Sequence, residues 1–140
     1  MGAVAIMKAL ADYRLNVSCA IVESPFASMY QTVGIRFRNF HIPQFPMAHL
    51  MLFWGGVENG FWAFGHRPVD YATHVKCPIL LQYGAKDDRV AGWETDSIYA
   101  HLQCTKQLIV YSMAGHDDMP ALYHDEWAKN VTSFLEAHKK

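Results

Sequence analysis

The fold of this chain is decided by the stretch CPILLQYGAKDDRV, residues 77–90. Its apolar part, Ile79 to Tyr83, is too short and too continuous for an amphipathic helix, and a proline and Gly84 bound it. Such a run is typical of a buried strand in a parallel sheet. Gly84 lets the chain turn sharply at the carboxyl end of this strand, where open α/β sheets bind their ligands. Asp87 and Asp88 follow the strand at this end, so either is placed where a catalytic carboxylate is usually found.

A second apolar run, from Leu108 to Met113, ends in Ala114-Gly115-His116 and repeats this layout of strand, glycine and polar residue. His116 follows Asp87 by 29 residues. That length accommodates one crossover helix, about Trp93 to Gln103, between two parallel strands. We therefore expect Asp87 and His116 at the same edge of the sheet, as the acid and the base of a nucleophile–His–acid triad.

In this order and setting, Asp87 and His116 resemble the last two triad members of the α/β-hydrolase family, whose chain order is nucleophile, acid, base. Met1-Gly2-Ala3-Val4-Ala5 resembles the residues that follow the serine in the family's G-x-S-x-G elbow. The resemblance implies that the serine lies directly before position 1, outside this chain, and that the backbone N–H of Met1 helps to form the oxyanion hole. Residues 1–140 would then be a partial domain, the C-terminal part of the fold, with about three parallel strands and flanking helices.

The segments on either side of the predicted core fit the same family pattern. Met1 to about Arg14 has apolar residues at helical spacing and matches the helix that follows the elbow. The run from Val17 to Val22 matches the next strand, and Glu23 at its end is an alternative acid. After His116, Asp118 is a candidate N-cap of a last helix, with Pro120 near its first turn.

Residues 27–70 are the least regular part of the chain and match the variable helical cap that the family inserts over its active site. We expect one helix within Phe26 to Phe40 and a second from Met47 to Trp54, stopped by Gly55-Gly56. The cap is rich in aromatic residues, which either line an apolar acyl or leaving-group pocket or pack the cap onto the sheet. The pocket candidates are Trp54, Phe61 and Trp62.

Three residues compete for the role of the acid. Asp87 stands third after Gly84, where the family pattern G-x-x-D has its acid, while Asp88 and Glu23 stay open as alternatives. We expect Asp88 to form a local ion pair with Arg89 instead. A metal held by His116 and the aspartates after it is a weaker alternative, because no H-E-x-x-H or Cys/His ligand spacing occurs.

The composition is that of an ordinary soluble globular domain, with 140 residues, 51% hydrophobic and 18% charged, and a net charge of −1. It favours neither nucleic acid nor membrane surfaces as partners, and no apolar run approaches the roughly 18 residues of a membrane span. The three cysteines have no C-x-x-C spacing, so we expect reduced thiols and a cytoplasmic location. Without a G-x-G-x-x-G or Walker-type loop, we expect no cofactor.

These observations predict a serine hydrolase that acts on small-molecule ester, amide or peptide substrates, with esters slightly favoured. The chain alone is expected to be inactive, and its first strand, lacking a partner on one side, is expected to promote self-association. Two alternatives stay open. One is a non-catalytic pseudo-hydrolase or binding partner, and the other is a flavodoxin-like domain in which Asp87 and His116 are far apart.

Overall fold

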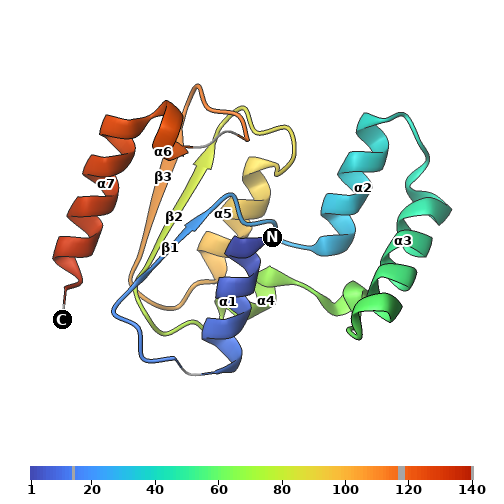
Figure 1. Cartoon of the computed structure of the whole chain (residues 1–140), viewed down its shortest axis with the longest axis horizontal. Coiled ribbons are helices and arrows are strands. Elements are labelled where there is room, and N and C mark those ends of the chain that lie inside the picture. The colour runs from blue at the N-terminus through green and yellow to red at the C-terminus, as the bar shows by residue number, and fades with distance from the viewer. Residues whose placement is uncertain (14, 117–118, 140) are drawn as a thin grey trace.

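The computed structural model describes residues 1–13, 15–116 and 119–139, and its centre is a parallel sheet (Figure 1). The sheet has three strands in the order β1 (Ala20–Glu23), β2 (Ile79–Gly84) and β3 (Lys106–Tyr111). Ile79 of β2 is paired with Ala20 on one side and with Lys106 on the other. All residues of β2 are buried, as its continuous apolar run predicts.

Helices cover both faces of the sheet (Figure 1). Their bounds are α1 (Gly2–Asp12), α4 (Pro68–Ala72), α5 (Gly92–His101), α6 (Met119–Leu122) and α7 (His124–Ala137). Leu81 of β2 belongs to a core cluster shared with α1, α4 and α5, whereas Leu80 packs with Val131 and Phe134 of α7. Because successive side chains of a strand point to opposite faces, both faces of β2 are buried.

The outer strands are shifted from their predicted bounds. β1 begins at Ala20 rather than at Val17, because pairing with β2 starts where the Ala20 N–H donates to the Pro78 carbonyl at 2.9 Å. β3 begins and ends two residues before the predicted Leu108 to Met113. The last helical region is divided into α6 and α7, and the candidate N-cap Asp118 lies outside the described residues.

The cap consists of α2 (Met29–Asn39), α3 (Gln44–Asn59) and the short 3-10 helix η1 (Ala63–Gly65). Figure 1 shows α2 and α3 as a hairpin beside the core, with α3 farther from the sheet. The prediction that Gly55-Gly56 stops the second cap helix is wrong, since α3 continues to Asn59 and ends at Gly60, which has a φ of 68°. Gly56 has a packing role instead, because a Cβ there would lie 2.7 Å from the Phe61 carbonyl oxygen.

Within the described part of the chain, no helix has the length and apolar character that crossing a membrane requires.

Candidate active site

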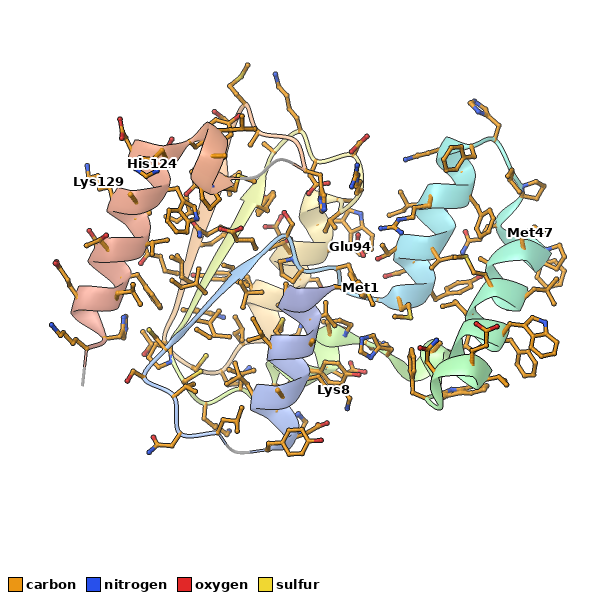
Figure 2. The ribbon with its side chains drawn as sticks, viewed as in Figure 1. Met1, Lys8, Met47, Glu94, His124 and Lys129 are labelled. Carbon is orange, nitrogen blue, oxygen red and sulfur yellow. The ribbon has the colours of Figure 1, made fainter. Side chains whose placement is uncertain are left out.

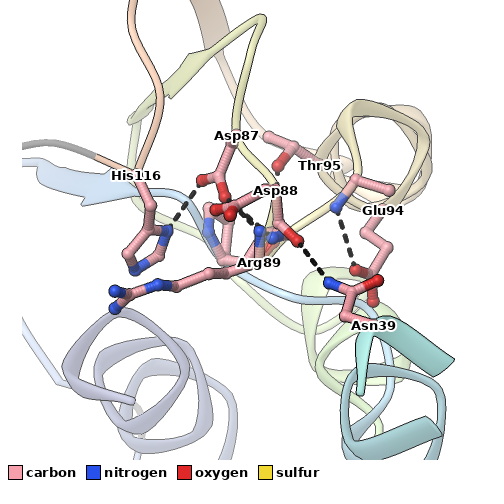
Figure 3. Close-up of polar contacts among 10 residues, drawn as sticks. Asn39, Asp87, Asp88, Arg89, Glu94, Thr95 and His116 are labelled. Carbon is pink, nitrogen blue, oxygen red and sulfur yellow. Dashed lines mark hydrogen bonds and ion pairs between the residues drawn. The ribbon is translucent and has the colours of Figure 1, made fainter. Parts of the chain in front are cut away.

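Asp87 and His116 meet at the carboxyl edge of the sheet, where the loops after β2 and β3 lie side by side (Figure 3). The Nδ1 atom of His116 is 2.8 Å from Oδ2 of Asp87. The Asp87 side chain is 1% exposed, and the His116 side chain is 35% exposed. The carboxylate is therefore shielded from water while the imidazole stays open to a ligand.

Backbone groups hold the second oxygen of the Asp87 carboxylate. Oδ1 accepts hydrogen bonds from the N–H groups of Arg89, at 2.8 Å, and Val90, at 2.9 Å. These two hydrogen bonds fix the orientation of the carboxylate. A carboxylate in a fixed orientation can hold an imidazole in one tautomer.

Gly84 brings the two loops together through its lack of a side chain. A Cβ at this position would lie 2.5 Å from the Ala114 carbonyl oxygen and would also overlap the carbonyl oxygen of Gly115. In this space the Lys86 N–H donates to the Ala114 carbonyl at 2.8 Å. Close packing of the two loops, rather than a left-handed backbone, is therefore what requires glycine at the end of β2.

The two alternative acids have other contacts. The backbone carbonyl of Asp88 accepts a hydrogen bond from Asn39 at 3.4 Å, and the carboxylate of Glu23 accepts from Trp127 at 2.6 Å and from Gln82 at 3.3 Å. The predicted ion pair between Asp88 and Arg89 is wrong, since none joins these two described residues, and the Arg89 side chain extends toward His116 in Figure 3.

His116 opens onto a groove of about 620 Å³ along the free edge of β1, between α1 and the α6–α7 region. The lining residues are Met1, Gly2, Ala3, Ile6, Ile21, Val22, Glu23, Ser24, His116, Met119, Pro120, Trp127 and Val131. Met1 stands at the N-cap of α1, so the free N–H groups and the positive end of this helix lie at the same groove as the imidazole. The structure thus brings together Asp87, His116 and Met1.

Ser24 lines the same groove and was not singled out by the sequence. It follows β1 directly, has a φ of 43°, and its N–H donates to the Gln82 carbonyl at 2.8 Å. Such a backbone is uncommon for a residue other than glycine and often occurs at functional sites. No feature of the residues around Ser24 in the sequence indicates this conformation.

The three candidate pocket residues lie elsewhere. Phe61 and Trp62 line a hollow of about 300 Å³ on the cap, and Trp54 on α3 is 58% exposed. None of the three lines the groove that contains His116. Their role in binding a substrate stays a prediction.

A buried carboxylate connects the cap to the loop that carries Asp87. Glu94 of α5 is fully buried, and it accepts hydrogen bonds from the Ala27 N–H at 3.2 Å, the Thr32 hydroxyl at 3.3 Å and the Ala91 N–H at 3.3 Å. Burial raises the pKa of Glu94, while these hydrogen bonds partly oppose that rise. Glu94 therefore anchors the start of α2 beside the end of the Asp87 loop.

The described residues contain no group of three or more His, Cys, Asp or Glu side chains that could hold a metal ion. Asp117 and Asp118, which the metal alternative invoked beside His116, lie outside those residues. Cys19, Cys77 and Cys104 are free thiols.

No protein-family model matches the sequence, and no curated protein matches it. Solved structures do resemble the chain. An esterase of Pyrococcus furiosus has a TM-score of 0.72 at 21% identity, over 99% of this chain and 51% of the esterase chain. The acylaminoacyl peptidase of Pyrococcus horikoshii has a TM-score of 0.72 at 18% identity, over 98% of this chain and 22% of its own. Acetyl xylan esterase 1 of Thermoanaerobacterium has a TM-score of 0.59 at 19% identity, over 87% of this chain and 38% of the esterase chain.

These likenesses establish the fold. The chain has the architecture of the C-terminal part of an α/β-hydrolase, with three parallel strands, flanking helices and a helical cap. It spans about half the length of the Pyrococcus furiosus esterase. The flavodoxin-like alternative required Asp87 and His116 to be far apart, and their contact argues against it.

Proposed function

We propose that this chain supplies the acid and the base of a serine hydrolase that cleaves ester or peptide bonds. The observation that carries the proposal is the 2.8 Å contact between His116 and the buried carboxylate of Asp87 at the open groove. The folds of the esterase and the acylaminoacyl peptidase support the same reaction class. Small-molecule esters are the favoured substrates, with peptides second.

In the proposed mechanism the nucleophile is a serine directly before Met1, in a longer chain of which this sequence is a part. Nδ1 of His116 is engaged by Asp87, so Nε2 takes the proton of the serine hydroxyl as its oxygen attacks the carbonyl carbon. The same nitrogen then gives this proton to the leaving alcohol or amine, and water repeats the two transfers to release the acid. Asp87 stays ionised throughout.

The groove supports this position for the nucleophile. A serine joined to Met1 would stand at the N-terminal end of α1, on the groove that His116 lines. The backbone N–H of Met1 would donate to the oxygen that becomes negatively charged in the tetrahedral intermediate. The reaction would need no cofactor, and the free thiols of the three cysteines favour a cytoplasmic location.

The free edge of β1 has a second consequence that we also propose. An unpaired strand edge beside an apolar groove favours association with another chain. In the longer protein, the strand that leads to the serine would cover this edge. In the isolated chain, the edge would promote self-association.

Activity measurements on two forms of the protein test the proposal. The isolated chain should not hydrolyse p-nitrophenyl acetate above the background rate, whereas the longer protein with Gly-x-Ser directly before Met1 should hydrolyse it with a dependence on His116. Enzymatic hydrolysis by the isolated chain, lost on His116→Ala, would contradict the proposed nucleophile. A reading frame that continues upstream of Met1 without a Gly-x-Ser would favour the pseudo-hydrolase alternative.

A further inference from the structure

The outer face of α3 carries a stripe of large apolar side chains exposed to solvent. The stripe consists of Met47, Leu50, Met51, Trp54 and Val57, and these side chains are 44–58% exposed. Their spacing of three or four residues puts them on one side of the helix. The buried residues Ala48, Leu52 and Gly56 occupy the opposite side and face the rest of the cap. We refer to the five exposed residues as the cap stripe.

The cap stripe continues into neighbouring aromatic side chains of the cap. Phe53 is 47% exposed, Phe61 42% and Trp62 68%. With side-chain areas of roughly 150–250 Å², these fractions give a contiguous apolar surface on the order of 800 Å². The largest apolar patch of a typical monomer covers about 300–600 Å². The surface instead matches the roughly 800 Å² that each partner contributes to a stable protein–protein interface.

The charges of α3 favour a protein partner over a lipid surface. Glu58 is the single Asp, Glu, Lys or Arg residue in 44–59. A helix that binds anionic lipid usually carries Lys or Arg beside its apolar face, and α3 has neither. An apolar face rich in methionine and aromatic residues and poor in charge is instead typical of the centre of a homodimer interface.

Gly55 is a second observation that points to a partner. It lies within α3, next to Gly56, but a Cβ at position 55 would meet no atom within 4 Å. A glycine inside a helix is less favourable than an alanine there, and no contact within the described chain requires one at this position. Gly55 lies at the border of the cap stripe, four residues after Met51, where a missing side chain lets a second helix approach closely.

We propose that the cap stripe is the interface of a homodimer in which α3 packs against α3 of a second copy. A two-fold axis makes the same residues meet from both sides, so the stripe needs only to be complementary to itself. The antiparallel arrangement is favoured because it separates the two Glu58 carboxylates and brings each toward the N-terminal end of the partner's α3.

This interface leaves the candidate active site open. α3 lies on the far side of α2 from the sheet, and Met47 lies far from Met1 across the molecule (Figures 1 and 2). The groove at the free edge of β1 shares no lining residue with the cap stripe. Dimerisation through the cap is therefore independent of the nucleophile, and its failure would leave the proposed function untouched.

The test is the dimer dissociation constant of the chain, measured by sedimentation equilibrium with and without Met51→Glu/Trp54→Glu. Because both side chains are more than half exposed, the double variant should keep the circular dichroism spectrum of the parent. Ile6→Glu is the matched control, since Ile6 is 44% exposed but lines the groove at β1. Combining the two sets of changes separates cap association from edge association.

We expect the chain to form cap dimers in the Ile6→Glu background, where association through the sheet edge is weakened, and the cap double variant to raise the dissociation constant of these dimers by at least about 100-fold. A dimer that survives the cap double variant but is lost with Ile6→Glu would overturn the proposal in favour of the sheet edge. A chain that stays monomeric in the Ile6→Glu background would overturn it as well. The proposal would also be overturned if the chain did not dimerise but bound zwitterionic phospholipid vesicles, and if the cap double variant lost this binding.

Discussion

The carboxyl edge of the sheet and the outer face of the cap differ in how their side chains are satisfied. At the sheet edge, the Asp87 carboxylate is 1% exposed, and both of its oxygens have partners within the chain. On the cap, Trp54 and its neighbours in the cap stripe are about half exposed. The difference teaches that the chain itself fixes the contact between Asp87 and His116, whereas the cap stripe has no partner within the described chain.

The largest expected effect concerns the sheet edge. In the longer protein with its serine, His116→Ala should lower kcat for an activated ester by about 10⁶-fold, because no base then takes the serine proton. His124→Ala is the control, since His124 is exposed at the start of α7 and should leave kcat unchanged. Equal rates for the His116 variant and the parent would remove His116 from the mechanism.

Substitution of one glycine in each region compares the packing of the sheet edge with that of the cap. Gly84→Ala should lower the free energy of unfolding by about 3 kcal/mol, since the new methyl group overlaps the carbonyls of Ala114 and Gly115. Gly55→Ala on the cap should instead raise it by about 0.5–1 kcal/mol, because its methyl group meets nothing. Urea unfolding in a background that combines Met51→Glu/Trp54→Glu with Ile6→Glu, which disrupts both proposed association surfaces, measures both. Similar effects of the two changes would contradict the contrast between edge and cap.

Loss of Glu94, which connects the cap to the Asp87 loop, is expected to lower the free energy of unfolding less than Gly84→Ala does. Glu94→Ala should lower the free energy of unfolding by about 2 kcal/mol, because it leaves the buried N–H of Ala27 without its acceptor. Hydrogen exchange should accelerate more in α2 than in β2, since Glu94 holds the start of the cap. Glu58→Ala, on the exposed side of α3, is the control and should change neither quantity. Uniform acceleration throughout the chain would show that Glu94 supports the whole fold rather than the cap.

The smallest expected effect is a dependence on pH. Burial raises the pKa of Glu94 above its usual 4.5, so the folded chain binds this proton more tightly than the unfolded chain does. The contribution to stability is therefore complete below pH 4.5 and is lost as the pH rises through the raised pKa. Glu94→Gln, which cannot ionise, should remove this part of the pH dependence of urea unfolding. Identical pH profiles for the variant and the parent would exclude Glu94 as its source.

The sheet could be predicted because the sequence pattern of each strand lies within a short stretch of the chain. The apolar run of β2, bounded by a proline and Gly84, indicates a buried strand without knowledge of its neighbours. The contact between Asp87 and His116 then follows from strand order, since two parallel strands end at the same edge. The fold class and its three strands are confirmed.

The cap and its anchor depend on contacts between residues far apart in the sequence. Gly56 lies inside α3 because the Phe61 carbonyl packs against it, and this contact exists only after the chain has turned at Gly60. Glu94 is 62 residues from Thr32 in sequence, so its hydrogen bond could not be inferred from local pattern. The backbone strain at Ser24 likewise has no local signature.

The most direct test of the central claim is the site of covalent labelling by a fluorophosphonate, identified by mass spectrometry in the longer protein. The account predicts one adduct, on the serine directly before Met1, formed much more slowly after His116→Ala because the serine then lacks its base. An adduct on Ser24, which shares the groove with His116, or labelling that does not depend on His116, would contradict it.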